Sequence, residues 1–213
     1  MSDKMNKVNY QLLLDKTIEE LDCPKTLLLH SCCAPCSSYV LEYLSQYFEI
    51  TVLYYNPNIT YEEEYAYRKS EQKRLIGAMQ PKYPIKFMDC DYNPMNFFTA
   101  VKGHEKEPEG GARCKICFEM RLRKTAELAE KNGFDYFTTT LTISPLKNAE
   151  LLNEIGDSLS AEYGVKYLNS DFKKRNGYKR SIELSKEYDL YRQDYCGCVY
   201  SKVERARAGC SAQ

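Results

Sequence analysis

The chain has no excess of charge of either sign. Its 213 residues include 30 Lys and Arg and 30 Asp and Glu, so the formal net charge is zero. A field over the whole molecule that attracts nucleic acid or an anionic membrane is therefore excluded, and any such binding site must be a local patch. Tryptophan is absent, and histidine occurs only twice.

Long apolar runs are also missing. No stretch approaches the roughly 20 apolar residues that a membrane-spanning helix needs, so we expect no membrane partner. Residues 1–21 contain acidic side chains and lack the apolar core that precedes the cleavage site of a secretory signal. We therefore expect the protein in the cytoplasm.

Strand-like and helix-like segments alternate along the chain. Short apolar runs predict strands at 26–30, 50–56, 84–91, 135–141 and 165–169. Amphipathic spacing and capping residues predict helices at 9–21, 37–48, 61–79, 113–131, 144–163 (with Ser144 as N-cap) and 178–188. This alternation predicts an α/β fold with a mostly parallel sheet and flanking helices, whose sites lie at the carboxyl ends of the strands.

The length suits a single domain, 1–213, with a sizeable core. We divide it into an N-terminal helical extension (1–22), an α/β core (24–170) and a C-terminal segment (171–213) that contains a helix and a C-x-C turn. Residues 102–112 are polar, with Pro108 and a glycine pair, and predict a loop.

Ten cysteines are the unusual feature of the composition. The cytosol keeps thiols reduced, so grouped cysteines there indicate metal binding or redox chemistry rather than a disulfide framework. Seven of the ten fall into three groups, which are Cys32, Cys33 and Cys36 (C-C-x-x-C), Cys114 and Cys117 (C-x-x-C), and Cys196 and Cys198 (C-x-C).

The first two groups are placed as a metal centre requires. The first follows the first strand, with Cys36 in the opening turn of the next helix, where the helix N-terminus favours a thiolate. Cys114 and Cys117 share one face of the helix at 113–131. Four thiolates suit zinc or an iron–sulfur cluster, and a structural zinc site stays open. The adjacent pair Cys32 and Cys33 is an awkward chelate for one tetrahedral ion, which favours a cluster.

The third group differs from the other two. Gly197 separates Cys196 from Cys198 and permits a tight ring. A disulfide between them is strained and therefore readily reduced, so we expect a pair that cycles between thiol and disulfide. The alternative is that both are further metal ligands.

The chain from Leu27 to Ser201 resembles the QueH type of epoxyqueuosine reductase. The resemblance is specific because several segments match together; no single segment would be sufficient. The segments are LLHSCCAPC, LYYNPNI with the following EEEYAYR, RCKICFEMRLRKTA, GFDYFTTTLTISPLKN, DFKK and LSKEYDLYRQDYCGCVYS.

The resemblance implies a fold, a reaction and a cofactor. The fold is Rossmann-like, of the nucleotide-binding PP-loop or HUP type. The reaction is the cobalamin-independent reduction of epoxyqueuosine to queuosine at the wobble position of tRNA, with an unidentified electron donor. A [4Fe-4S] cluster is implied on Cys32, Cys33, Cys114 and Cys117, a second mononuclear iron near Cys36, and a redox-active disulfide between Cys196 and Cys198.

Epoxide deoxygenation needs two electrons, two protons and a positioned acid. Candidates for the acid are Tyr195 and Asp194 beside the C-x-C turn and His30 beside the first group. RNA contact is expected where basic residues surround an aromatic one; the alternative there is a solvated face. The residues of this stretch are Lys173, Lys174, Arg175, Tyr178, Lys179 and Arg180.

Two other functions fit parts of the sequence. An ATP-dependent tRNA thiolase of the PP-loop type needs a glycine-rich S-G-G-x-D-S loop after the first strand, but HSCCAPCSS contains no glycine to form an anion-binding nest. A zinc-stabilised RNA-binding module without catalysis also fits the cysteines. Metal content and visible absorption distinguish that module from an iron–sulfur enzyme.

Overall fold

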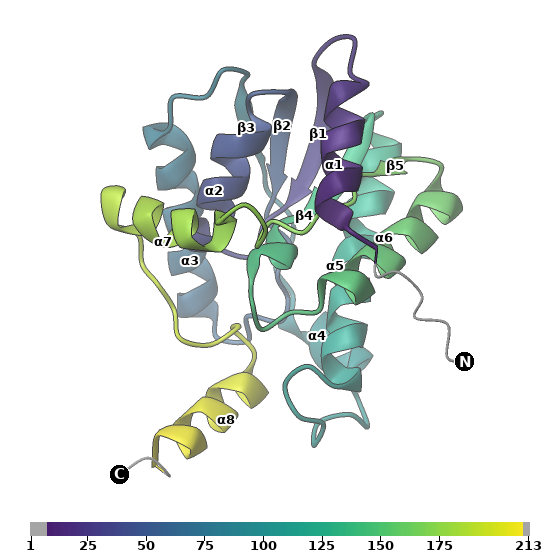
Figure 1. The fold of residues 1–213 in the computed structure, drawn as a ribbon. Coiled ribbons are helices and arrows are strands. Elements are labelled where there is room, and N and C mark those ends of the chain that lie inside the picture. The colour runs from purple at the N-terminus through teal and green to yellow at the C-terminus, as the bar shows by residue number, and fades with distance from the viewer. Residues whose placement is uncertain (1–7, 211–213) are drawn as a thin grey trace, which may run out of the picture.

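The computed structural model describes residues 8–210, so residues 1–7 of the predicted extension 1–22 and residues 211–213 of the predicted segment 171–213 lie outside it. The described chain alternates between strands and helices around one parallel sheet (Figure 1). The strands are β1 (Lys25–His30), β2 (Phe48–Leu53), β3 (Ile85–Met88), β4 (Tyr136–Thr139) and β5 (Lys166–Tyr167). The helices are α1 (Tyr10–Glu19), α2 (Ala34–Leu44), α3 (Glu62–Ala78), α4 (Pro94–Ala100), α5 (Ala112–Lys131), the 3₁₀-helix η1 (Thr140–Ile143), α6 (Ala149–Tyr163), α7 (Gly177–Glu187) and α8 (Val199–Cys210).

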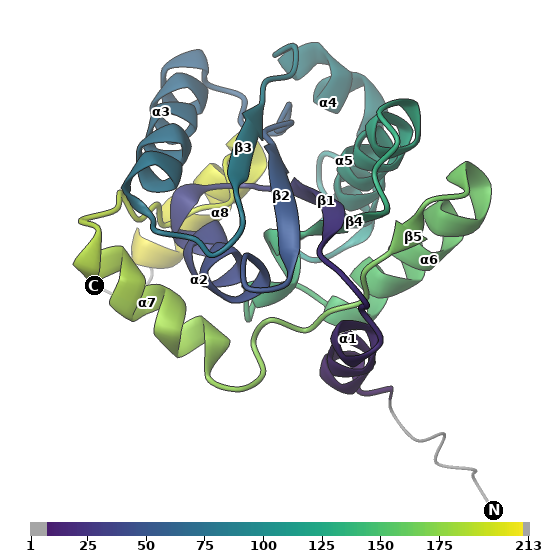
Figure 2. The same ribbon diagram turned by 90° about the horizontal axis from the view of Figure 1, so that it is seen from above.

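Helices cover both faces of the sheet, with α2, α3 and α7 on one side and α5 and α6 on the other (Figure 2). Strand β1 shows why this arrangement buries its apolar residues. Leu27 and Leu29 pack with Leu41 of α2, whereas Leu28 points the other way and packs with Leu122 of α5. Successive side chains of a strand alternate between faces, so a strand buried on both sides reads as a continuous apolar run.

The strand order β3-β2-β1-β4-β5 creates a crevice at the site end of the sheet. The chain proceeds outward from β1 through β2 to β3, then returns to pair β4 on the other side of β1. Ligands of such sheets bind at the carboxyl ends of the strands, where the order reverses. Here that point lies between β1 and β4, whose last residues His30 and Thr139 are in register.

The predicted Rossmann-like α/β class with a parallel sheet is confirmed, and so is a C-terminal helical segment. The division of 1–213 into three parts stays a prediction. Among residues 8–210, none of the helices combines the length and the apolar character that crossing a membrane requires.

The predicted start of the helix at 144–163 is wrong. Residues 140–143 form η1, and α6 begins only at Ala149. The side chain of Asn148 caps α6 by accepting a hydrogen bond from the Leu151 amide at 3.3 Å. The segment between η1 and α6 is a turn in which the Lys147 amide donates to the Ser144 carbonyl. An Asn N-cap supplies the acceptor that the first turn of a helix needs.

Replacing two helical glycines by alanine should have opposite effects on the stability of the fold. A Cβ on Gly156 of α6 would lie 2.3–2.4 Å from the ring of Tyr167 on β5, whereas a Cβ on Gly77 of α3 meets nothing within 4 Å. Gly156→Ala should destabilise the fold by about 1–3 kcal/mol through overpacking. Gly77→Ala should stabilise it by about 0.5–1 kcal/mol through lower chain entropy. Urea unfolding followed by circular dichroism measures both, and a Gly156→Ala variant as stable as the wild type would contradict the packing of α6.

Candidate active site

A cavity of about 400 Å³ lies at the carboxyl ends of β1 and β4. Six of the seven grouped cysteines line it: Cys32, Cys36, Cys114, Cys117, Cys196 and Cys198. The seventh, Cys33, is buried directly behind Cys32. The three groups, far apart in the sequence, therefore open into one space.

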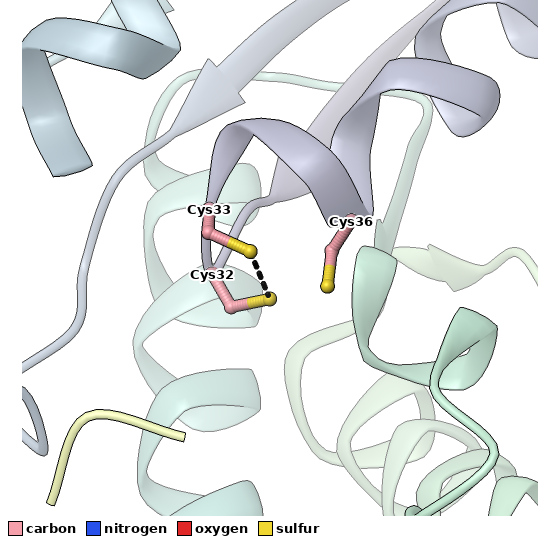
Figure 3. Close-up of side chains that lie close together, drawn as sticks. All are labelled: Cys32, Cys33 and Cys36. Atoms are coloured by element: carbon pink, nitrogen blue, oxygen red, sulfur yellow. Dashed lines mark hydrogen bonds between the residues drawn. The ribbon is translucent and has the colours of Figure 1, made fainter. Parts of the chain in front are cut away.

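The first group forms the bridge from β1 to α2. Cys33 is the N-cap of α2 with an extended backbone, and Cys36 stands in the first turn, as predicted. The Sγ atoms of Cys32, Cys33 and Cys36 lie within 4.8 Å of one another (Figure 3), a spacing at which one metal ion can contact all three. Hydrogen bonds from Cys33 and Cys36 lower the pKa of the Cys32 thiol well below its ordinary value. The thiolate, which is the form that binds metal, is thus concentrated on Cys32.

The second group stands at the start of α5. Cys114 accepts a hydrogen bond from the Gly110 amide at 3.2 Å, and Cys117 lies one turn later on the same side. Burial raises the pKa of Cys117 to about 11 and raises that of Cys114. The predicted shared helix face of this pair is confirmed, because both side chains line the cavity.

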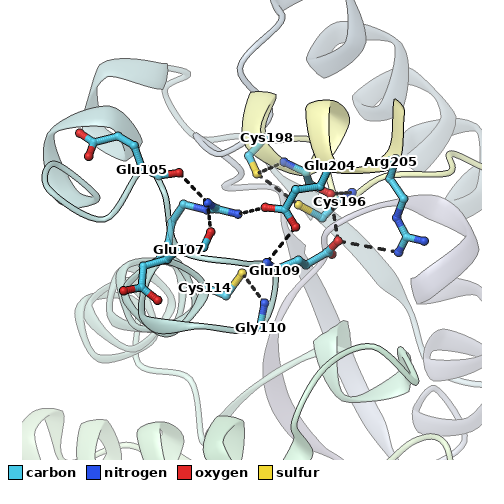
Figure 4. Close-up of polar contacts among 11 residues, drawn as sticks. Glu105, Glu107, Glu109, Gly110, Cys114, Cys196, Cys198, Glu204 and Arg205 are labelled. Atoms are coloured by element: carbon cyan, nitrogen blue, oxygen red, sulfur yellow. Dashed lines mark hydrogen bonds and ion pairs between the residues drawn. The ribbon is translucent and has the colours of Figure 1, made fainter. Parts of the chain in front are cut away.

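The third group is a turn at the start of α8. The Sγ atoms of Cys196 and Cys198 lie 3.5 Å apart, and Gly197 between them has a φ of +116°. The Ser201 amide donates to the Cys198 sulfur at 3.3 Å (Figure 4). The thiol–thiol hydrogen bond lowers the pKa of Cys196 to about 5 and raises that of Cys198.

The second and third groups share one apolar cluster. Cys117 and Cys198 pack with Phe97 and Val101, and Cys196 lies against the same cluster. Three of the four predicted cluster ligands (Cys32, Cys114 and Cys117) and both cysteines of the predicted redox pair therefore line the same cavity.

The buried cations that line the cavity were not predicted from the sequence. Arg68 and Arg113 are each 2 % exposed and Arg121 is 3 % exposed, and all three line the cavity together with Lys147. The negative charge of Cys32, Cys36 and Cys196 raises the pKa of Lys147 against the opposing effect of burial. Helical spacing does contain a signal, because Arg113, Cys117 and Arg121 recur every four residues on α5 and so share its buried face.

The loop between α4 and α5, predicted as a loop, contacts α8 at the cavity (Figure 4). Arg113 pairs with Glu204 of α8 at 2.8 Å, and Glu204 also accepts a hydrogen bond from the Glu109 amide at 2.9 Å. Glu109 in turn accepts from Ser201 at 3.3 Å and lies 3.7 Å from Arg205. These contacts attach the C-terminal helix beside the thiols of the C-x-C turn.

In the basic stretch predicted to bind RNA, some cations form ion pairs and others are exposed. Three of its cations are paired with carboxylates: Lys173 with Asp171 at 2.9 Å, Arg175 with Asp15, and Arg180 with Glu42 at 2.6 Å. Lys174 and Lys179 are exposed. Tyr178 is 38 % exposed and lines the cavity. The stretch thus borders the cavity through Tyr178.

The three candidate proton donors have different environments. His30 is fully buried, its ring nitrogens lie 2.9 Å from Thr139 Oγ1 and 3.2 Å from the Tyr55 carbonyl oxygen, and burial lowers its pKa to about 3. It is therefore neutral and holds the ends of the strands together. Tyr195 and Asp194 line the cavity, and burial raises the pKa of Tyr195 to about 12.

Comparison with known proteins connects this site to a family. The model of the family described as epoxyqueuosine reductase QueH matches residues 27–204. A protein of that name from Streptococcus pyogenes serotype M1 is 46% identical over 200 residues, covering 92% of this chain and 78% of its own length.

Two further relatives carry the same name. The protein from Staphylococcus epidermidis is 45% identical over 95% of this chain and 88% of its own length. The protein from Thermotoga maritima is 35% identical over 84% of this chain and 92% of its own length. Agreement over nearly whole chains shows that the chain belongs to the epoxyqueuosine reductase QueH family and is an oxidoreductase.

Proposed function

We propose that this protein reduces epoxyqueuosine in tRNA to queuosine by iron–sulfur-dependent removal of the epoxide oxygen. The observation that carries the proposal is the single cavity into which all three cysteine groups open, in a chain of the QueH family. The proposal places the reaction in the cytoplasm, where cysteines stay reduced.

The donor atoms of the cavity fit an iron–sulfur cluster. Cys32, Cys33, Cys114 and Cys117 would supply four thiolates once they lose their protons to a bound centre, and thiolates are the usual ligands of such clusters. Cys36 lies in the three-sulfur group with Cys32 and remains for a second iron. Arg113 and Arg121 flank Cys117 on α5, and their buried charge compensates an anionic centre that would otherwise be costly to bury.

When bound, such a cluster would supply single electrons, and its iron chemistry would include Lewis-acid polarisation of the epoxide oxygen. The chain itself supplies a matched source of electrons and protons. Oxidation of the Cys196 and Cys198 thiols to a disulfide releases two electrons and two protons, which is what conversion of an epoxide to an alkene and water consumes. An external reductant of the thiol class then restores the pair.

The substrate's approach is proposed along the stretch 173–180. Tyr178 offers a ring on which a base can stack at the mouth of the cavity, and the exposed Lys174 and Lys179 are free to contact phosphate. Lys173, Arg175 and Arg180 complete the proposed RNA-binding surface, although their ion pairs lower the charge that each offers. A local patch of this kind suits a chain without net charge.

Anaerobically purified protein should contain about four irons per chain, with matching sulfide and a broad visible absorption band. Cys114→Ser should lose most of the iron and the colour, because it removes one of four proposed ligands. Cys23→Ser is the control, since Cys23 is exposed and belongs to none of the groups. Full iron retention in Cys114→Ser contradicts the ligand assignment. A colourless zinc protein would favour the RNA-binding module instead.

Cys196→Ser and Cys198→Ser should each keep the visible absorption and tRNA binding but lose epoxide reduction. The reason is that each variant removes one sulfur of the 3.5 Å pair without touching the four proposed ligands. Mass mapping of oxidised wild-type protein should find a disulfide between the two cysteines. Loss of iron in either variant would make these cysteines ligands and would contradict the redox role.

Replacement of both Lys174 and Lys179 by alanine should weaken tRNA binding. Each lost phosphate contact reduces the steepness of log K against log salt by about 0.7–0.9, so the double variant should lose about 1.5. The matched control replaces Lys82 and Lys131, two exposed lysines that precede the amino ends of β3 and β4, whereas the cavity lies at the carboxyl ends of the strands. Equal salt slopes for both double variants would remove this stretch from the RNA interface.

A further inference from the structure

The C-x-C turn is held by a single buried arginine from α3. Arg68 donates from Nη2 to the Tyr195 carbonyl and from Nη1 to the Cys196 carbonyl, each at 3.4 Å. Its guanidinium also lies 5.0 Å from the centre of the Tyr195 ring. A guanidinium presents its donors in a fixed fork, so it fixes two successive carbonyls relative to each other.

The segment before α3 holds the same turn from a second direction. The Asn58 side chain donates to the Cys196 carbonyl at 3.4 Å, and the Thr60 amide donates to the Gly197 carbonyl at 3.3 Å. A Cβ on Gly197 would lie 2.7 Å from Cγ1 of Ile59. The turn is thus pressed against residues 58–60, and the carbonyls of residues 195–197 are all engaged by this segment and Arg68.

The buried guanidinium of Arg68 has its hydrogen-bond partners in this turn and in Glu64. Its side chain is 2 % exposed and is balanced by Glu64, whose carboxylate accepts from Nε at 2.7 Å. Burying a guanidinium is costly unless its donors find partners, and two of the partners here are carbonyls of the thiol turn. Asn58 and Arg68 belong to the segments LYYNPNI and EEEYAYR. These segments contain none of the proposed cluster ligands and none of the residues of the proposed RNA-binding surface.

We propose that Arg68 is the positioning residue of the thiol pair. By fixing the carbonyls of Tyr195 and Cys196, it keeps the Cys196 and Cys198 sulfurs 3.5 Å apart at the wall of the cavity. Loosening the turn lowers the effective concentration of one thiol at the other and so disfavours ring closure. The inference rests on the proposed redox role of this pair.

The test is the equilibrium of full-length protein with reduced and oxidised glutathione. In that exchange the two cysteines lose two protons and two electrons to form their disulfide, and glutathione disulfide is reduced to two thiols. Mass mapping quantifies the peptide that contains Cys196 and Cys198 in each redox buffer. Iron content is measured in the same samples as an independent readout.

The main variant is Arg68→Met combined with Glu64→Gln, which avoids leaving a carboxylate without its partner. Its disulfide equilibrium constant should fall at least tenfold, equivalent to about 30 mV. Arg68→Lys keeps the charge without the fork and should give an intermediate fall. Arg74→Met is the matched control. Arg74 also lies on α3 and donates to the carbonyls of Tyr188 and Asp189, which belong to the C-terminal segment but precede the C-x-C turn. This variant should match the wild type.

A wild-type constant in both Arg68 variants overturns the inference, and so does an equal fall in Arg74→Met or in Glu64→Gln alone. If the double variant does not fold, Arg68→Lys decides the question by its own constant. Absence of a 196–198 disulfide in the wild type at every ratio of glutathione would instead overturn the redox role proposed above. Failure of the positioning role of Arg68 and failure of the redox role of the thiol pair therefore give different results.

Discussion

The parallel pairing of β1 with β4 is the constraint on which the rest of the structure depends. Because His30 and Thr139 are in register, the segments that leave the two strands start side by side, although they are more than a hundred residues apart. The Cys32 amide lies 3.4 Å from Thr140 Oγ1 as a direct result. The crevice at this switch point is where open α/β sheets bind ligands, and here cysteines occupy it.

Electrostatics then make the crevice suitable for thiolates. Both α2 and α5 begin at the cavity, so the partial positive charge of two helix N-termini acts beside Cys36 and Cys114. It opposes the hydrogen bonds with neighbouring thiols that raise the pKa of Cys36 and the burial that raises the pKa of Cys114. The buried guanidiniums of Arg68, Arg113 and Arg121 add full positive charges. A chain without net charge therefore still places buried cations at the cavity where an anionic centre is proposed, although Glu64 and Glu204 pair with two of them.

The C-terminal segment completes the cavity through contacts with two distant parts of the chain. Arg68 and Asn58 hold its turn, while Arg113 and Glu109 hold α8. Cys196 and Cys198 consequently border the same apolar cluster as Cys117. This proximity is what the proposed exchange of electrons between the thiol pair and a centre held by other residues requires, and it depends on packing rather than on sequence spacing.

Local pattern was sufficient for the parallel sheet, for Cys36 in the first turn of α2, and for the shared face of Cys114 and Cys117. These features follow from apolar periodicity and helix geometry, which act within a few residues. Local pattern does not determine the start of α6, because Ser144 and Asn148 are both good N-caps and the turn after η1 decides between them. Only the tertiary structure showed that Arg68 is buried against a turn more than a hundred residues away. Whether a charged side chain is buried or solvated depends on partners that sequence neighbours do not specify.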